Sequence, residues 1–110
     1  MSDESTLGAF EEQVMLAVLH ARDDAFGMSV RREIESRTSR EVAIGAVYAT
    51  LDRLEAKKLV TSVRQPGAGG SRRLFRVTAA GKKALAHTRD IRERLWRGID
   101  VRSFTAISAS

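Results

Sequence analysis

Residues 44–57, IGAVYATLDRLEAK, carry the clearest helical periodicity in the chain. Apolar side chains recur here every three or four residues, which is typical of a helix that buries one face. The apolar positions are Ile44, Val47, Tyr48, Leu51 and Leu54. The spacing therefore predicts a helix over residues 44–57 with one side turned toward a hydrophobic core.

Weaker helical patterns precede this segment. Apolar spacing predicts a first helix over about residues 8–21 and a second over about residues 27–37. We expect the second helix to bury Met28, Val30 and Ile34. With 110 residues, the chain is long enough for one domain with one modest core.

The segments that follow have a period typical of strands. Residues 59–64 and 73–78 are rich in Val, Thr, Leu and Phe, and the glycine-rich residues 65–71 join them. Two such runs predict a β-hairpin. Thr78 is a good N-cap for a last helix over residues 79–96, because its hydroxyl can accept from the free amides of the first turn.

Charge is distributed unevenly along the chain. The net charge is +5, but residues 1–55 carry eleven acids and six bases, whereas residues 56–110 carry thirteen bases and three acids. Nine cations lie between Glu55 and Asp90 without an intervening acid. Such a stretch favours a polyanionic partner, nucleic acid first of all. The alternative is a solvated basic face that binds nothing.

The predicted elements describe a winged helix-turn-helix domain followed by a C-terminal dimerisation helix. The expected fold is mainly α with a small β-hairpin. We expect residues 1–78 to form the DNA-binding domain and residues 79–99 the dimerisation helix. The remaining residues, 100–110, are expected to form a frayed tail.

In such a domain the third helix presents its outer face to the major groove. Small residues at its start let the backbone approach DNA closely, and cations at its end and on the wing can reach phosphates. The candidate DNA-binding residues are Gly45, Ala46, Tyr48, Ala49, Thr50, Arg53, Lys57, Lys58, Arg64, Arg72 and Arg73. The alternatives are an ordinary amphipathic helix and hairpin cations that only prevent edge strands from pairing.

Four segments between Leu7 and Leu85 resemble the PadR family of bacterial transcriptional regulators. They read LGAFEEQVMLAVL, DDAFGMSVRREIE, IGAVYATLDRLEAKKLV and RRLFRVTAAGKKAL. The combination G-x-x-Y-x-x-L-x-R-L-E followed by R-x-T-x-x-G is specific. The resemblance implies a homodimeric repressor that binds a near-palindromic operator by neighbouring genes and is often released by a small hydrophobic ligand. It also implies that Tyr48 meets the DNA backbone and that Arg72 and Arg73 form the basic end of the wing.

Three features depart from the family pattern. Lys58 stands where the family has glycine, and a left-handed conformation there would cost about 1–2 kcal/mol. The usual aromatic pair of the second strand is replaced by Leu74 and Phe75. The chain also has the short form of the family, so dimerisation must rest on the last helix and on the first.

The last helix carries an apolar stripe that is longer than its own domain could easily cover. The stripe predicts a partner helix in a homodimer. The candidate dimer-interface residues are Leu85, Ile91, Leu95 and Trp96. Trp96 is either an interface anchor or, by the resemblance, part of a pocket for a small hydrophobic or aromatic effector.

Other classes of protein find little support in the residues. The chain has no cysteine and only two distant histidines, so we expect no metal and no cofactor. No nucleophile has a plausible base nearby, so we expect no catalysis. The absence of a long apolar stretch or signal peptide predicts a cytoplasmic protein without a membrane anchor. A winged-helix protein-interaction module without DNA binding remains the alternative, and it would have no need of so many cations.

Overall fold

The computed structural model describes residues 6–67 and 70–104. The described elements are α1 (Ala9–Ala21), a 3-10 turn η1 (Arg22–Asp24), α2 (Gly27–Thr38), α3 (Ile44–Ala56), β1 (Val60–Gly67), β2 (Gly70–Val77) and α4 (Ala79–Trp96). The order is mainly helical with one antiparallel hairpin, which confirms the predicted fold class. None of the described helices has the length and hydropathy that a bilayer crossing requires.

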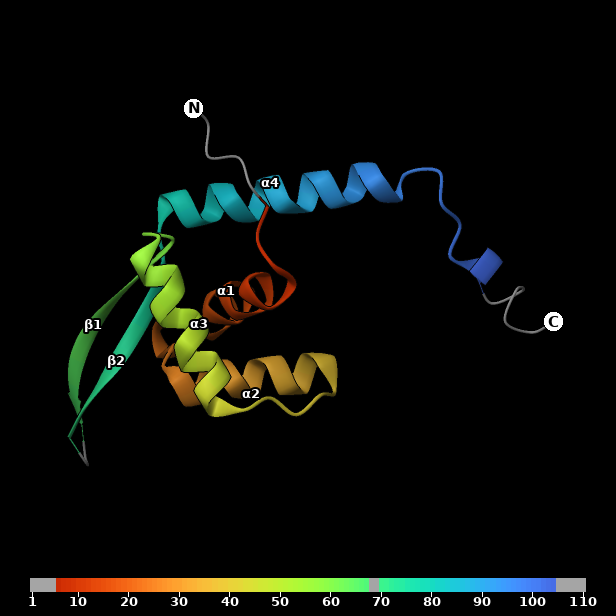
Figure 1. Ribbon diagram of the computed structural model, residues 1–110. Helices are drawn as coiled ribbons and strands as arrows, with labels where there is room; N and C mark the ends of the chain where they lie inside the picture. The colour runs from red at the N-terminus through yellow and green to blue at the C-terminus, as the bar shows by residue number, and fades with distance from the viewer. Residues whose placement is uncertain (1–5, 68–69, 105–110) are drawn as a thin grey trace.

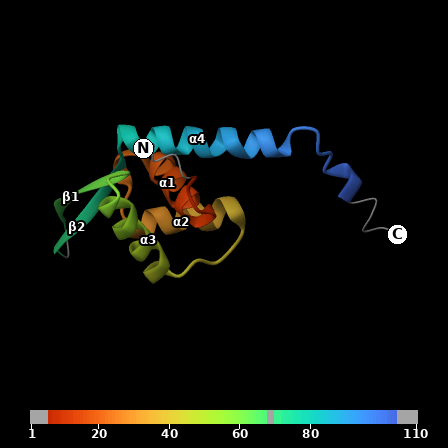
Figure 2. The same ribbon diagram turned by 45° about the horizontal axis from the view of Figure 1, so that its top comes forward.

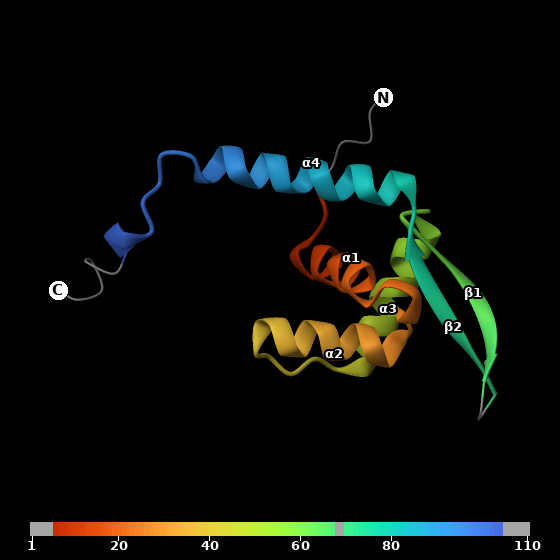
Figure 3. The ribbon, with the colours of Figure 1, turned by 180° about the vertical axis from the view of Figure 1, so that it is seen from behind.

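Helices α1, α2 and α3 pack together, and the hairpin projects from one side of this group (Figure 1). Helix α4 crosses over α1 and continues well beyond it, as the views in Figure 2 and Figure 3 also show. The radius of gyration is 16.5 Å. A compact domain of this length would have about 13 Å. The molecule is therefore extended, with the last turn of α4 standing clear of the core.

The core forms where the three helices and the base of the hairpin meet. Its fully buried residues include Val14, Met15, Val30, Val47, Leu51, Leu54, Val60 and Phe75. Met28 is exposed, so the expectation that it is buried is wrong. Val30 and Ile34 lie one helical turn apart and face the core, whereas Met28 points to a different side of α2.

The hairpin is longer than predicted. Its register runs from Val60 opposite Val77 to Gly67 opposite Gly70. Residues 68–69 of the predicted glycine-rich loop lie outside the described residues. The amide of Phe75 donates to the carbonyl of Ala25 at 2.8 Å, so β2 is also fixed to the segment that precedes α2.

A compact joint connects α3, the hairpin and α4. Lys58 has a φ of 65°, so the left-handed conformation whose cost was considered above is present at this position, where the family has glycine. The Thr78 hydroxyl donates to the Lys58 carbonyl at 2.8 Å and accepts from the Gly81 amide at 3.0 Å, so Thr78 is the predicted N-cap. A Cβ at Gly81 would overlap the carbonyl oxygen of Leu59. The R-x-T-x-x-G motif thus places the start of α4 directly against the backbone between α3 and β1.

The two halves of α4 have different surroundings. Leu85 is only 8% exposed within the single chain, and Thr88 is also buried. Leu95, by contrast, is 75% exposed and Trp96 is 48% exposed. Leu85 therefore belongs to the core of its own domain, so the part of the stripe that the domain leaves uncovered lies further along α4.

Beyond α4 the described chain bends away from the axis of that helix (Figure 1). Gly98 has a φ of 85°, and the Asp100 carboxylate accepts from the Arg102 amide at 3.0 Å. The ring of Phe104 lies 6.3 Å from that of Trp96. Residues 105–110 of the predicted frayed tail lie outside the described residues.

Candidate nucleic-acid interface

The outer face of α3 begins as a smooth, open surface. Gly45, Ala46 and Ala49 are all exposed. A Cβ placed on Gly45 would find no other atom within 4 Å. A surface of this kind allows another backbone or a base edge to approach the helix closely.

Tyr48 stands at one side of this surface, and its ring is held by α2. The ring lies against Gly27 at the first residue of α2, where a Cβ would overlap the ring carbon Cζ and the hydroxyl oxygen. Gly27 is buried and does not need a positive φ, so the close approach of the ring explains the glycine. The contact fixes the direction of Tyr48, which remains partly exposed.

Thr50 does not lie on this face. Its exposed fraction is 2%, because it lies on the helix between the buried residues Val47, Leu51 and Leu54. The expectation that Thr50 is exposed to the major groove is therefore wrong. Its hydroxyl instead accepts a hydrogen bond from Arg53 Nη2 at 3.3 Å.

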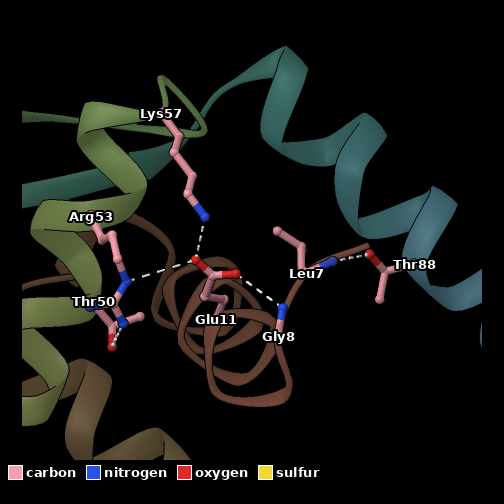
Figure 4. Close-up of polar contacts among 7 residues, drawn as sticks. All are labelled: Leu7, Gly8, Glu11, Thr50, Arg53, Lys57 and Thr88. Carbon is pink, nitrogen blue, oxygen red and sulfur yellow. Dashed lines mark hydrogen bonds and ion pairs between the residues drawn. The ribbon is translucent and has the colours of Figure 1, made fainter. Parts of the chain in front are cut away.

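The cationic end of α3 is bound to α1 through Glu11 (Figure 4). One carboxylate oxygen of Glu11 accepts from Lys57 Nζ at 2.8 Å and lies 4.0 Å from Arg53 Nε. The other accepts from the Gly8 amide at 3.0 Å and caps α1. The hydrogen bond from Lys57 is the main reason that the pKa of Glu11 lies below its usual value. No local sequence pattern points to Glu11 as a partner of Lys57, because it precedes Lys57 by 46 residues.

The same segment connects α1 with α4. The amide of Leu7 donates to the Thr88 hydroxyl at 3.0 Å (Figure 4). Glu12 accepts from Arg92 of α4 at 2.6 Å. The start of α1 is thus bound to α3 on one side and to α4 on the other.

The three predicted wing arginines differ in their surroundings. Arg64 is exposed, and no ion pair joins it to another residue in the described part of the chain. The Arg72 guanidinium lies 4.1 Å from the centre of the Phe26 ring and 4.0 Å from Asp24, and its side chain is still half exposed. Arg64 and Arg72 therefore remain accessible to a partner.

Arg73 is held within the protein. Its guanidinium donates to Asp52 at 2.9 Å and to Glu55 at 2.6 Å, and lies 4.8 Å from the centre of the Phe75 ring. Burial alone would lower the pKa of Arg73, but the bonds to the two carboxylates outweigh it and raise that pKa. Glu55 also accepts from the Ser62 hydroxyl at 2.8 Å.

In the folded chain, acidic side chains compensate part of the run of nine cations. Among the described residues, five of the nine form ion pairs: Lys57, Arg72, Arg73, Arg76 and Arg89. Most of their partners are acids from the first half of the chain, which the fold brings back to the hairpin and the end of α3. The remaining positive charge is concentrated on fewer residues than the sequence indicates.

An open helix face beside a basic hairpin, on three packed helices, defines a winged helix-turn-helix protein. The model of the transcriptional regulator PadR-like family matches residues 15–87. Transcriptional regulator Rv3488 of Mycobacterium tuberculosis is 38% identical over 88 residues, which cover 78% of this chain and 81% of the relative. The chain belongs to the PadR-like family of transcriptional regulators. This confirms the resemblance, implies DNA binding and assigns the protein to regulators rather than enzymes.

Solved structures agree in fold. A PadR family regulator from hypervirulent Clostridium difficile R20291 has a TM-score of 0.61 at 23% identity, covering 93% of this chain and all of its own. BpsR of Bordetella bronchiseptica, solved in a study of how 6-hydroxynicotinic acid regulates its DNA binding, has a TM-score of 0.62 at 18% identity. That match covers 99% of this chain and 79% of BpsR.

Proposed function

We propose that this protein is a homodimeric, sequence-specific repressor that binds a near-palindromic operator beside the genes it controls. The observation that carries the proposal is the open face of α3, where Gly45, Ala46 and Ala49 leave room for DNA beside an oriented Tyr48. A DNA-binding regulator of this kind acts in the cytoplasm. We assign double-stranded DNA as its partner and no cofactor.

The proposed DNA contacts are of two kinds. The small residues of α3 bring its backbone close to the bases, while longer side chains bind phosphates. The proposed contacts are Gly45, Ala46, Tyr48, Ala49, Arg53, Lys57, Lys58, Arg64 and Arg72. Few of these can distinguish one base pair from another, so DNA shape and half-site spacing supply much of the specificity.

The exposed apolar residues of α4 support a homodimer. Leu95 and Trp96 are uncovered in the single chain, and Leu16 and Leu19 of α1 line a shallow groove beside α4. A second copy can bury these surfaces and place two α3 helices about 34 Å apart, one turn of DNA. The dimerisation region then begins within α4 after Thr88, since the first half of that helix packs on the DNA-binding domain.

An effector site near Trp96 is part of the proposal. BpsR shows that a regulator with a related fold can respond to a small aromatic acid. Trp96 is half exposed and is the only tryptophan of the chain, so quenching of its fluorescence reports on this place alone. Planar aromatic compounds should quench it and release DNA; no response across a varied panel would refute an effector site here.

The DNA-binding proposal is tested with duplex DNA from the region upstream of its own gene. Fluorescence anisotropy should show binding that weakens steeply as salt rises from about 50 to 200 mM. Arg64→Gln and Arg72→Gln should each lower the log–log salt slope by about 0.9. Binding that is absent, or that does not depend on salt, would refute the repressor and favour a protein-interaction module.

A further inference from the structure

The structure points to a brace between α3 and the hairpin, in which Arg73 positions the wing and does not contact a phosphate. We infer this from a cluster of four side chains, Asp52, Glu55, Ser62 and Arg73, which we call the brace cluster. The inference rests on the proposed DNA-binding function and gives a different role to a residue that the sequence assigned to DNA.

Both strands of the hairpin attach to α3 through this cluster. Arg73 of β2 donates to Asp52 and Glu55, which lie about one helical turn apart on α3. Ser62 of β1 donates to Glu55 as well. Glu55 therefore connects one helix to two strands, with Asp52 as a second point of attachment.

The charge of the cluster opposes a phosphate contact by Arg73. Two carboxylates share one guanidinium, so the cluster as a whole is negative. If Arg73 turned outward to a phosphate, two carboxylates would be left without a cation next to a polyanion, and within the cluster only Glu55 would keep a hydrogen bond, from Ser62. The Arg73 side chain is also only 25% exposed and lies over Phe75, so turning outward would break that contact too.

Binding of DNA by a winged helix requires the wing and the third helix at a fixed separation. The helix enters a major groove about 12 Å wide, while the wing reaches the neighbouring backbone. Phe75 fixes the hairpin to Ala25 on one side, and the brace cluster fixes it to α3 on the other. Loss of the brace should therefore let the wing move relative to α3 without removing a phosphate contact.

Arg64 is a matched control for Arg73. The two arginines face each other directly in the antiparallel register. Arg64 is exposed, and within the described residues it has no ion-pair partner. Changing each to Gln removes the same charge from the same level of the hairpin.

The experiment measures DNA affinity over a salt series, and hydrogen exchange of the hairpin amides in the protein without DNA. Arg64→Gln should lower the salt slope by about 0.9 and leave hairpin exchange unchanged. Arg73→Gln should keep the wild-type slope, lower affinity about tenfold at every salt concentration and speed hairpin exchange. The double variant D52N/E55Q, which keeps Arg73, should speed exchange in the same way.

Two results would overturn the brace: a fall in slope for Arg73→Gln equal to that of Arg64→Gln, or hairpin exchange in Arg73→Gln equal to wild type. Failure of the wild-type protein to bind any duplex would instead refute the proposed function. In that case unchanged exchange in Arg73→Gln would still overturn the brace, so the two failures remain distinguishable.

Discussion

Replacing Gly45 with Ala should stabilise the protein and weaken its binding to DNA. Alanine is favoured over glycine by about 0.5–1 kcal/mol within a helix. Gly45 is the second residue of α3, and its new Cβ would meet no atom within 4 Å. We expect about 0.5 kcal/mol of stabilisation, which corresponds to a rise of roughly 2–4 °C in Tm for a chain of this size. The added methyl group would stand where DNA must approach, so affinity should fall about five- to tenfold.

Thermal unfolding by circular dichroism and DNA binding by anisotropy should be measured on the same preparation at the same protein concentration. Gly81→Ala is the matched contrast, because its Cβ would lie 2.8 Å from Val77 Cγ1 and 3.0 Å from Met15 Cε, with the Leu59 carbonyl closer still. That variant should lose about 3 kcal/mol or more. A Gly45→Ala protein with a raised Tm and unchanged DNA affinity would refute the placement of DNA on this face.

Three further predictions concern the joint, the end of α3 and the dimer. Thr78→Val should cost about 2 kcal/mol in unfolding free energy, because it removes the α4 cap and the bond to the Lys58 carbonyl. Thr78→Ser keeps the hydroxyl and should retain most of the stability. Equal losses for the two variants in urea titrations would contradict the cap. Glu11→Gln keeps an acceptor for the Gly8 amide but loses the charge bound by Lys57, so it should cost about 1 kcal/mol at neutral pH. Folding lowers the pKa of Glu11 from 4.5, so the stability that its charge contributes is present above pH 4.5 and disappears as the pH falls through the lowered value. The unfolding free energies of wild type and Glu11→Gln should therefore become equal in acid. A difference that persists there would exclude the ion pair as its source. Leu95→Glu alters a side chain that is exposed in the single chain, so it should leave the Tm of the monomer unchanged. In sedimentation experiments the variant should shift from dimer to monomer. A dimer that the substitution leaves unaltered would exclude the far half of α4 as the interface.

Features that depend on neighbouring residues could be predicted from the sequence. The bounds of α4 and the cap by Thr78 follow from the apolar spacing and from one hydroxyl at the right position. The residues alone leave the left-handed conformation of Lys58 open, and only the family's usual glycine at this turn indicates it. For α4 and its cap the cause lies within a few residues of the effect, so the pattern is visible in one segment of the chain.

Contacts between distant residues could not be predicted in this way. Glu11 precedes Lys57 by 46 residues, and Asp52 precedes Arg73 by 21, so no local pattern connects either pair. The charge distribution along the chain therefore overstated the free positive charge of the hairpin. Only the folded chain shows that Arg73 is occupied while Arg64 is accessible.

The structure buries both Thr50 and Leu85, for two different physical reasons. The reason for Thr50 is visible in the sequence, and the reason for Leu85 is not. Thr50 is polar, but a turn of 100° per residue puts it between Val47 and Leu54 on the buried side of α3. Leu85 belongs to the same apolar stripe as Leu95, and nothing in the spacing indicates where α4 leaves the domain. That point depends on how α1 packs against α4.

The connections of α1 bear on how the proposed dimer would select its operator. Glu11 accepts from Lys57 at the end of α3, the Leu7 amide donates to Thr88, and Glu12 accepts from Arg92, so α1 is bonded to both α3 and α4. In a dimer joined through α4, the separation and angle of the two α3 helices would then follow from the packing at the dimer axis. Since the small residues of α3 offer few groups for base readout, this spacing would be the main constraint on which DNA fits the proposed dimer. An effector near Trp96 could therefore release DNA by changing the packing of α4, without touching a residue of the DNA-binding face.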